Sequence, residues 1–177
     1  MIYIVCLLVA GAVIALDLVT KYLAVAMDFN VVIIKELLKF KLTYNTGAAF
    51  SFLSDKSWAM AFFITITSLT LLAILGYFIF NVIKKRRISK WFAIALSFVF
   101  SGALGNFIDR IALGKVRDFI FVFYNTDIFP AIFNVADIAL VVGVIMTCIY
   151  LLFLDKDALF KATKKDNNGT NEADNNW

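Results

Sequence analysis

The stretch WAMAFFITITSLTLLAILGYFIFNVIKKRR, residues 58–87, decides the fold class of this chain. Residues 58–83 carry no charged side chain, and a helix of about 20 such residues crosses the roughly 30 Å hydrocarbon core of a bilayer. The basic residues at 84–87 follow at once, and a short basic loop remains on the cytoplasmic side by the positive-inside rule. The stretch therefore predicts a membrane span whose carboxyl end faces the cytoplasm.

The rest of the chain has the same apolar character. It has 177 residues, of which 62% are hydrophobic, and its mean hydropathy is +0.87. The other long apolar stretches lie at residues 2–26, 91–113 and 131–154. Four spans with a cytoplasmic loop between the second and third place both termini in the cytoplasm. The basic residues, which give a net charge of +4, are then a topology signal, and we expect no nucleic-acid partner.

This pattern predicts an all-α membrane protein, a four-helix transmembrane bundle with a small strand-containing cradle outside the cytoplasm. Residues 40–44 alternate apolar and polar side chains and predict a short strand. The turn signal Asn45-Thr46-Gly47 follows, and residues 48–52 are the candidate for a second strand. We predict a single transmembrane domain at residues 1–154, with outer loops at 27–57 and 114–130. Residues 155–177 are predicted to form a cytoplasmic, disordered tail.

Polar groups concentrate at one end of the predicted bundle. The second span contributes only hydroxyls, whereas the outer ends of the other spans and the outer loops carry charged and amide residues: Asp17, Lys21, Asn45, Asn106, Asp109, Arg110, Asp118, Asn134 and Asp137. A charge at the bilayer centre costs about 2.5 to 3.5 kcal/mol on insertion scales, so such a cluster indicates chemistry. A transporter needs polar groups through the whole depth, and a cluster at one interface favours an enzyme. A small transporter or lipid-binding scaffold with a headgroup site is the alternative.

The absence of histidine narrows the chemistry. It excludes Ser-His and Cys-His nucleophilic sites and HExxH zinc sites. A carboxylate pair remains available for acid–base catalysis, and Asp118 and Asp137 are the candidates. We expect no metal and no cofactor.

Several residues of the cluster also have a structural interpretation. Asp109 and Arg110 are expected to neutralise each other, and Lys21 is expected to extend to the lipid headgroups. Asn106 and Asn134 can join helices by hydrogen bonds. Gly105 belongs to a surface of small residues, 101–105, which is typical of close helix packing.

Five segments together resemble the lipoprotein signal peptidases, also called signal peptidase II, a bacterial family of aspartic membrane peptidases. They are residues 17–21, 45–51, 102–110, 116–119 and 129–137, and their order and spacing match the family over all but the tail. The resemblance implies a four-helix bundle in the cytoplasmic membrane with both termini cytoplasmic, a periplasmic cradle and an active site on the outer face. It implies cleavage of diacylglyceryl-modified prolipoproteins before the lipidated cysteine, with phospholipids as neighbours and no cofactor. We expect a monomer.

The resemblance also assigns roles to single residues. The catalytic dyad falls on Asp118 and Asp137, and structural support falls on Asp109 and Gly105. The implied substrate-binding residues are Asp17, Asn45, Asn106, Arg110 and Asn134.

Three positions depart from the family's pattern. Leu18 stands where glutamine is common, and Ile138 replaces a serine after one catalytic aspartate. Arg117 replaces an apolar residue before the other. A cation beside Asp118 is expected to favour the ionised form of that carboxyl.

Overall fold

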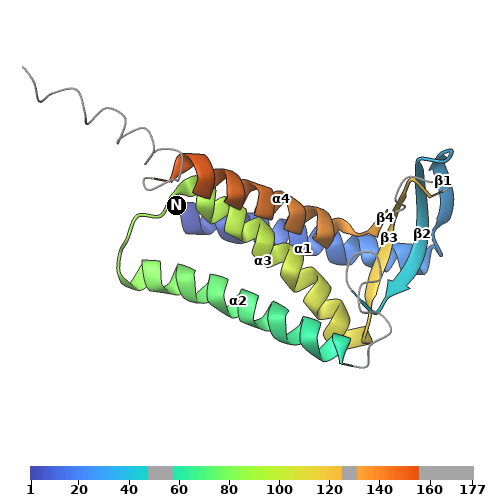
Figure 1. Cartoon of the computed structure of the whole chain (residues 1–177), viewed down its shortest axis with the longest axis horizontal. Helices are drawn as coiled ribbons and strands as arrows, with labels where there is room; N and C mark the ends of the chain where they lie inside the picture. The colour runs from blue at the N-terminus through green and yellow to red at the C-terminus, as the bar shows by residue number, and fades with distance from the viewer. Residues whose placement is uncertain (48–57, 125–130, 156–177) are drawn as a thin grey trace, which may run out of the picture.

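A computed structural model describes residues 1–47, 58–124 and 131–155. Within these residues four helices run side by side, and a small sheet closes one end of the bundle (Figure 1). The helices are α1 (Ile2–Ala26), α2 (Ala59–Ile83), α3 (Lys90–Leu113) and α4 (Val135–Ile149), the last extended by a π-helical turn, η2 (Tyr150–Leu154). Each is long and apolar enough to cross a membrane when η2 is counted with α4, which confirms the four predicted spans. The candidate strand at 48–52 and the predicted tail beyond residue 155 lie outside the described residues.

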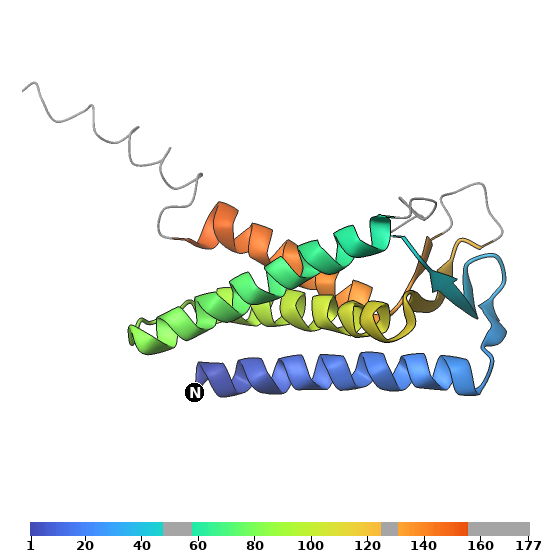
Figure 2. The ribbon, with the colours of Figure 1, turned by 90° about the horizontal axis from the view of Figure 1, so that it is seen from below.

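Helix α3 is the centre of the bundle and contacts each of the other three helices (Figure 2). Its buried face consists mainly of small residues, which allow close approach of helices in lipid. A methyl group added at Gly102 would collide with the carbonyl oxygen of Ala136 in α4. One added at Gly143 of α4 would come within 2.6 Å of the backbone nitrogen of Val99. The small-residue surface therefore packs α3 against α4, as predicted.

The four described strands form an antiparallel sheet in the order β1-β2-β3-β4. They are β1 (Asn30–Ile34), β2 (Leu38–Asn45), β3 (Val116–Val122) and β4 (Ala131–Phe133). The predicted strand at 40–44 lies within β2, and the small sheet agrees with the predicted strand-containing cradle beside a four-helix bundle. Strands β1 and β3 lie in the two predicted outer loops, and β4 lies in residues assigned to the fourth span. β3 is rich in Val, Ile and Phe, which favour strands, and its register places Asp118 opposite Thr43.

The fourth span begins later than predicted, at Val135 instead of residue 131. Asn134 caps the helix: its side-chain oxygen accepts a hydrogen bond from the backbone N–H of Asp137, and the Asp137 carboxylate accepts one from the backbone N–H of Asn134. This reciprocal capping box satisfies two backbone donors and fixes the start of α4. At the end of α3, Gly114 adopts a left-handed conformation with φ 65°, which glycine tolerates, and the chain turns into β3.

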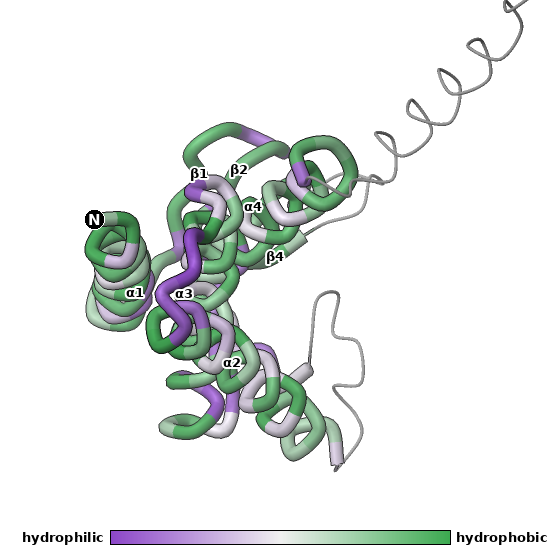
Figure 3. Tube along the Cα trace, turned by 90° about the vertical axis from the view of Figure 1, so that its left-hand side faces the viewer, coloured by the Kyte–Doolittle hydropathy of each residue, from purple (hydrophilic) through white to green (hydrophobic). Residues whose placement is uncertain are grey.

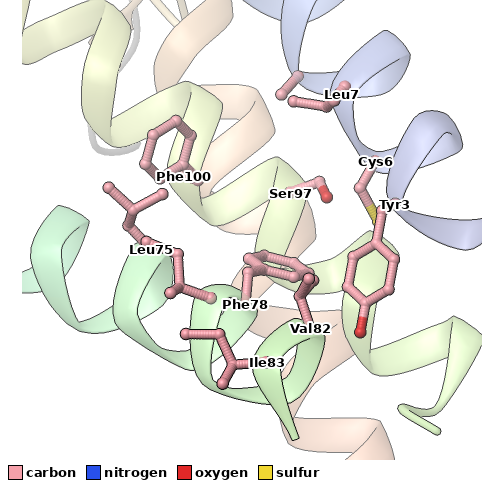
Figure 4. Close-up of a pocket in the computed structure, with 11 residues that line it drawn as sticks. Tyr3, Cys6, Leu7, Leu75, Phe78, Val82, Ile83, Ser97 and Phe100 are labelled. Carbon is pink, nitrogen blue, oxygen red and sulfur yellow. The ribbon is translucent and has the colours of Figure 1, made fainter. Parts of the chain in front are cut away.

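The half of the bundle remote from the sheet is apolar. The four helices are hydrophobic over most of their length (Figure 3). A cavity of about 340 Å³ between α1, α2 and α3 is lined mainly by apolar side chains, among them Leu7, Phe78 and Phe100 (Figure 4). In α2 the hydroxyls of Thr65, Ser68 and Thr70 each donate to the carbonyl four residues earlier.

One polar residue of α2 corrects the prediction that this span holds only hydroxyls. Asn81 lies near the end of α2 that is remote from the sheet, and its side-chain amide donates to the carbonyl of Tyr77. This bond within the helix satisfies a buried amide in an apolar setting.

Candidate active site

The sheet end of the bundle gathers the polar residues that the sequence singled out. α1 supplies Asp17 and Lys21, β2 ends in Asn45, and β3 carries Asp118. The end of α3 and the start of α4 supply the remainder: Asn106, Asp109, Arg110, Asn134 and Asp137. Hydrogen bonds and ion pairs join residues of elements that are far apart in the chain, so these residues form one site.

Two carboxylates stand at its centre, and each is held by amide donors. Asp118, which is 3% exposed, accepts hydrogen bonds from the side-chain amides of Asn134 at 2.7 Å and Asn45 at 3.1 Å. Asp137 accepts from the side-chain amide of Asn106 at 2.7 Å and from the backbone N–H of Asn134 at 3.0 Å. All four donors are neutral N–H groups, so no cation neutralises either carboxylate directly among the described contacts.

Burial makes Asp118 a weaker acid than an ordinary aspartate. Loss of water around the carboxylate, and next the negative charge of Asp137, raise the pKa of Asp118 from 3.8 to about 6. The hydrogen bonds from Asn45 and Asn134 act in the opposite direction and are outweighed. The negative charge of Asp137 therefore acts on Asp118, because a like charge nearby disfavours the ionised form.

Asn106 and Asn134 join the carboxylates to each other. The Nδ2 group of Asn134 donates to Asp118 and also to the side-chain oxygen of Asn106 at 3.0 Å. The Nδ2 group of Asn106 donates to Asp137. The two asparagines thus connect α3, α4 and β3, which agrees with their structural interpretation, and they also contact the candidate catalytic groups.

Lys21 does not extend to the membrane surface as predicted. Its side chain is fully buried, and its ammonium lies 2.8 Å from Asp17 Oδ2 and 3.5 Å from Asp109 Oδ2. It also donates to the side-chain oxygen of Asn106 at 3.0 Å. The prediction is wrong because Lys21 lies on the face of α1 that packs on α3, where buried carboxylates provide an alternative to water.

Asp109 pairs with Arg117 and not with its neighbour Arg110. The Arg117 guanidinium approaches Asp109 with two nitrogens, at 2.6 and 3.2 Å, and its backbone N–H adds a bond of 2.9 Å. Consecutive residues on a helix do not face each other, which explains why the predicted Asp109–Arg110 pair is wrong. Asp109 is fully buried, and this fork anchors the start of β3 to α3.

Arg117 therefore does not hold Asp118 in the ionised form, contrary to expectation. Successive strand residues point to opposite faces, so the Arg117 cation turns to Asp109 while Asp118 turns to Asn134. The hydrogen bond to Asp109 raises the pKa of Arg117 above its usual value.

Arg110 lies on another side of α3. Its Nη2 donates to the carbonyl of Gly47 at 3.3 Å, and its guanidinium lies 5.2 Å from the ring centre of Phe63. Its Nε is buried and has no hydrogen-bond partner among the residues that the structure describes. Asn45 begins the same turn, since its side-chain oxygen accepts from the backbone N–H of Gly47 at 2.9 Å.

Asp17 is fully enclosed by protein. One oxygen accepts from the backbone N–H of Ala136 at 2.9 Å, and the other faces Lys21. A methyl group added at Gly105 would lie 2.5 Å from that second oxygen, so a residue without a side chain makes room for Asp17. Within the described part of the chain, no group of three or more His, Cys, Asp or Glu side chains is arranged to hold a metal ion.

The comparisons with known proteins bear on the whole chain. Residues 9–153 match the sequence model for signal peptidase (SPase) II. The chain belongs to the lipoprotein signal peptidase family. It is 44% identical to the lipoprotein signal peptidase of Enterococcus faecalis, over 93% of this chain and 94% of the relative. It is 42% identical to that of Pseudomonas syringae pv. tomato, over 76% of this chain and 78% of the relative.

The fold agrees with that assignment. A bacterial membrane enzyme solved by the in meso method at 2.3 Å resolution superposes with a TM-score of 0.69 at 34% identity, covering 97% of this chain and 94% of that one. Lipoprotein signal peptidases are hydrolases that cleave signal peptides from prolipoproteins, and this multi-pass membrane protein is a peptidase of that class. Because the chain belongs to this peptidase family, the alternative hypotheses of a small transporter or a lipid-binding scaffold are rejected.

Sequence reasoning missed the partners of Lys21 and Arg117 inside the site. The spacing of Asp17 and Lys21, four residues apart on one helix face, was the signal that could have placed Lys21 inside the bundle. The pairing of Arg117 with Asp109 depends on how β3 returns across the end of α3, and no local pattern encodes it.

Proposed function

We propose that this chain is an aspartic endopeptidase that cleaves diacylglyceryl-modified prolipoproteins immediately before the lipidated cysteine, with Asp118 and Asp137 as the catalytic pair. The observation that carries the proposal is a pair of carboxylates, Asp118 buried and Asp137 half-buried, each held by neutral amide donors and joined to the other through Asn106 and Asn134. Two such groups cannot both ionise easily, so they share one proton.

The charges around the pair favour this single-proton state. Among the described residues, the site contains four carboxylates, those of Asp17, Asp109 and the pair, and three cations, those of Lys21, Arg110 and Arg117. With one proton on the pair, three negative charges oppose three positive ones. An ionised aspartate and a protonated one are then present together, which is the arrangement that acid–base catalysis requires.

The mechanism needs no covalent intermediate. The ionised aspartate removes a proton from a water molecule, and the water oxygen attacks the carbonyl carbon of the scissile peptide. The protonated aspartate donates its proton to the carbonyl oxygen. Collapse of the tetrahedral intermediate breaks the C–N bond, and the leaving amine receives a proton from the pair. Water is thus divided between the new carboxyl and the new amine.

Arg110 and Asn45 are the residues best suited to position the substrate backbone. Both contact the turn at Gly47, and the Arg110 Nε has a hydrogen to donate. Polar groups of a peptide near lipid need such partners. Asn106 and Asn134 already donate to the catalytic pair and hold it in place. Asp17 supports the site from within, because neither of its oxygens is exposed.

The topology fits a substrate anchored in the outer leaflet. The basic residues at 84–87 lie between α2 and α3, at the end opposite the sheet (Figure 1). By the positive-inside rule this end is cytoplasmic, which puts both termini inside and the catalytic pair on the outer face. The acyl chains of the substrate then remain in the bilayer, where each buried methylene contributes about 0.8 kcal/mol. We expect the chain to act as a monomer.

The test is signal-peptide release by the purified chain in lipid or detergent. A diacylglyceryl-modified prolipoprotein is expected to be cut before its modified cysteine, and the same polypeptide without the lipid is expected to remain intact. Equal cleavage of both forms would contradict the proposed substrate requirement. Mass spectrometry of the released peptide identifies the bond that is cut.

A further inference from the structure

A directed set of hydrogen bonds leads from α1 to the catalytic pair. It begins at the ammonium of Lys21, which is fully buried and lies 3.0 Å from the side-chain oxygen of Asn106. It continues from the Nδ2 group of Asn106 to Asp137 at 2.7 Å. Lys21 therefore contacts neither catalytic carboxylate in a described hydrogen bond, yet only one side chain separates it from Asp137.

The orientation of Asn134 is fixed by the backbone. Its side-chain oxygen must face the N–H of Asp137, because that N–H can only donate. Its Nδ2 group must then point the other way, where it donates to Asp118 at 2.7 Å and to the side-chain oxygen of Asn106 at 3.0 Å. The cap of α4 thus decides which atom Asn134 presents to Asp118.

Within the part of the chain that the structure describes, the side-chain amide of Asn106 has no such backbone partner. Its side-chain oxygen receives two donors, Lys21 Nζ and Asn134 Nδ2, both at 3.0 Å. A flipped Asn106 would turn its NH₂ group toward an ammonium and a second NH₂ group, and its oxygen toward the Asp137 carboxylate. An ammonium has three donors and no acceptor, so Lys21 opposes the flipped orientation more strongly than a neutral donor does.

We propose that Lys21 is a positioning residue for the reaction: it fixes the side-chain amide of Asn106 so that this amide donates to Asp137. The inference rests on the proposed function, since it matters for catalysis only if Asp137 belongs to the catalytic pair. Lys21 acts through Asn106 and does not touch the substrate or the attacking water.

Lys21 is also a counter-ion, and the test must separate the two roles. Replacing Lys21 alone leaves the buried Asp17 without its cation, which is expected to damage the fold. The double substitution Asp17→Asn with Lys21→Met removes both charges and keeps the oxygen that accepts from Ala136. Asp109 retains its fork with Arg117, so the double variant leaves neither residue 17 nor Asp109 with an unpaired charge.

The expected result is a loss of turnover without a comparable loss of binding. D17N/K21M is expected to lower kcat by about 10- to 100-fold, the scale of a misplacement near the reacting groups, and to leave KM close to wild type. The matched control is K35M/E36Q, which removes a lysine and an acid from an exposed pair on the connection between β1 and β2. The control is expected to retain both constants.

Dependence on Asn106 distinguishes positioning from general weakening of the fold. In an Asn106→Ala background, D17N/K21M is expected to cause no further fall in kcat, because the group through which Lys21 acts is already gone. A merely structural role predicts the same fractional loss in both backgrounds, and that result would overturn the proposal. Wild-type kcat in D17N/K21M would overturn it as well.

A second variant keeps the idea testable if D17N/K21M does not fold. Asn106→Asp retains an oxygen for Lys21 and replaces the NH₂ group that faces Asp137 by an oxygen, so kcat is expected to fall as far as in Asn106→Ala. Near-normal kcat in Asn106→Asp would overturn the proposal. These outcomes can be distinguished from failure of the proposed function. If Asp137→Asn remains active, the assignment of the catalytic pair is wrong. If Asp137→Asn is inactive and D17N/K21M is fully active, only the role of Lys21 is refuted.

Discussion

The two arginines of the site, Arg110 and Arg117, are expected to respond differently to the same substitution. Arg117→Met removes the fork to Asp109, a fully buried carboxylate. Breaking a buried pair typically costs about 3 to 5 kcal/mol. Asp109 keeps Lys21 at 3.5 Å and the backbone N–H of residue 117 at 2.9 Å, which places the expected loss at the lower end, about 3 kcal/mol.

This loss is measurable as a thermal shift. For a chain of this size 1 kcal/mol corresponds to about 2 to 4 °C, so Arg117→Met is expected to lower Tm in detergent by about 6 to 12 °C. Arg110→Met serves as the matched variant, because the Arg110 guanidinium bonds only the Gly47 carbonyl among the described contacts. It is expected to keep Tm near wild type while cleavage of a lipidated prolipoprotein falls.

A further substitution tests the cause of the shift. Asp109→Asn in the Arg117→Met background removes the unpaired charge and is expected to recover part of the lost stability. If Arg117→Met unfolded at the wild-type temperature, or if Arg110→Met lost as much stability as Arg117→Met, the assignment of Asp109 to Arg117 would be refuted.

Three other outcomes follow from the site. Because the pKa of Asp118 is raised to about 6, the folded state binds this proton more tightly than the unfolded chain, so its contribution to stability is lost as pH rises from about 4 to 6. Asp118→Asn is then expected to raise Tm relative to wild type at pH 7 and not at pH 4, and an equal difference at both pH values would contradict this. Gly105→Ala is expected to lower stability by about 1 to 3 kcal/mol, because its methyl group meets Asp17; unchanged thermal unfolding would show that the site relaxes. Activity is expected to survive EDTA, and a loss restored by a divalent cation would indicate a metal site.

The four spans could be predicted from sequence because hydropathy and the basic loop act locally. A helix of the right length with no charges needs no knowledge of its neighbours. The strands form only by pairing with distant segments. Strand β3 pairs with β2, more than 70 residues away in the chain, and no hairpin turn in the sequence predicts this pairing. The start of α4 was misplaced because residues 131–133 are apolar enough to continue a span. The capping geometry of Asn134, visible only in the structure, shows that the helix begins after these residues.

Some features of the site could likewise be predicted from the sequence, and others could not. Asp118, Asp137 and the asparagines could be predicted as site residues from their residue types and spacing, because a carboxylate or amide near lipid is energetically costly and therefore indicates a function. The pairing of charges could not, because it depends on which helix face meets which neighbour. Lys21 was assigned to the membrane surface and Arg117 to Asp118, whereas packing against α3 directs both to Asp109.

The central claim is that Asp118 and Asp137 act as one catalytic unit, and single-turnover cleavage of a lipidated prolipoprotein tests it most directly. Asp118→Asn and Asp137→Asn keep the shape of each side chain and are each expected to lower the rate by about 10²- to 10⁴-fold. The double variant is expected to be no slower than the slower single variant, because the two groups share one step. Near-normal cleavage by either folded single variant, or fully multiplicative losses in the double variant, would contradict the account.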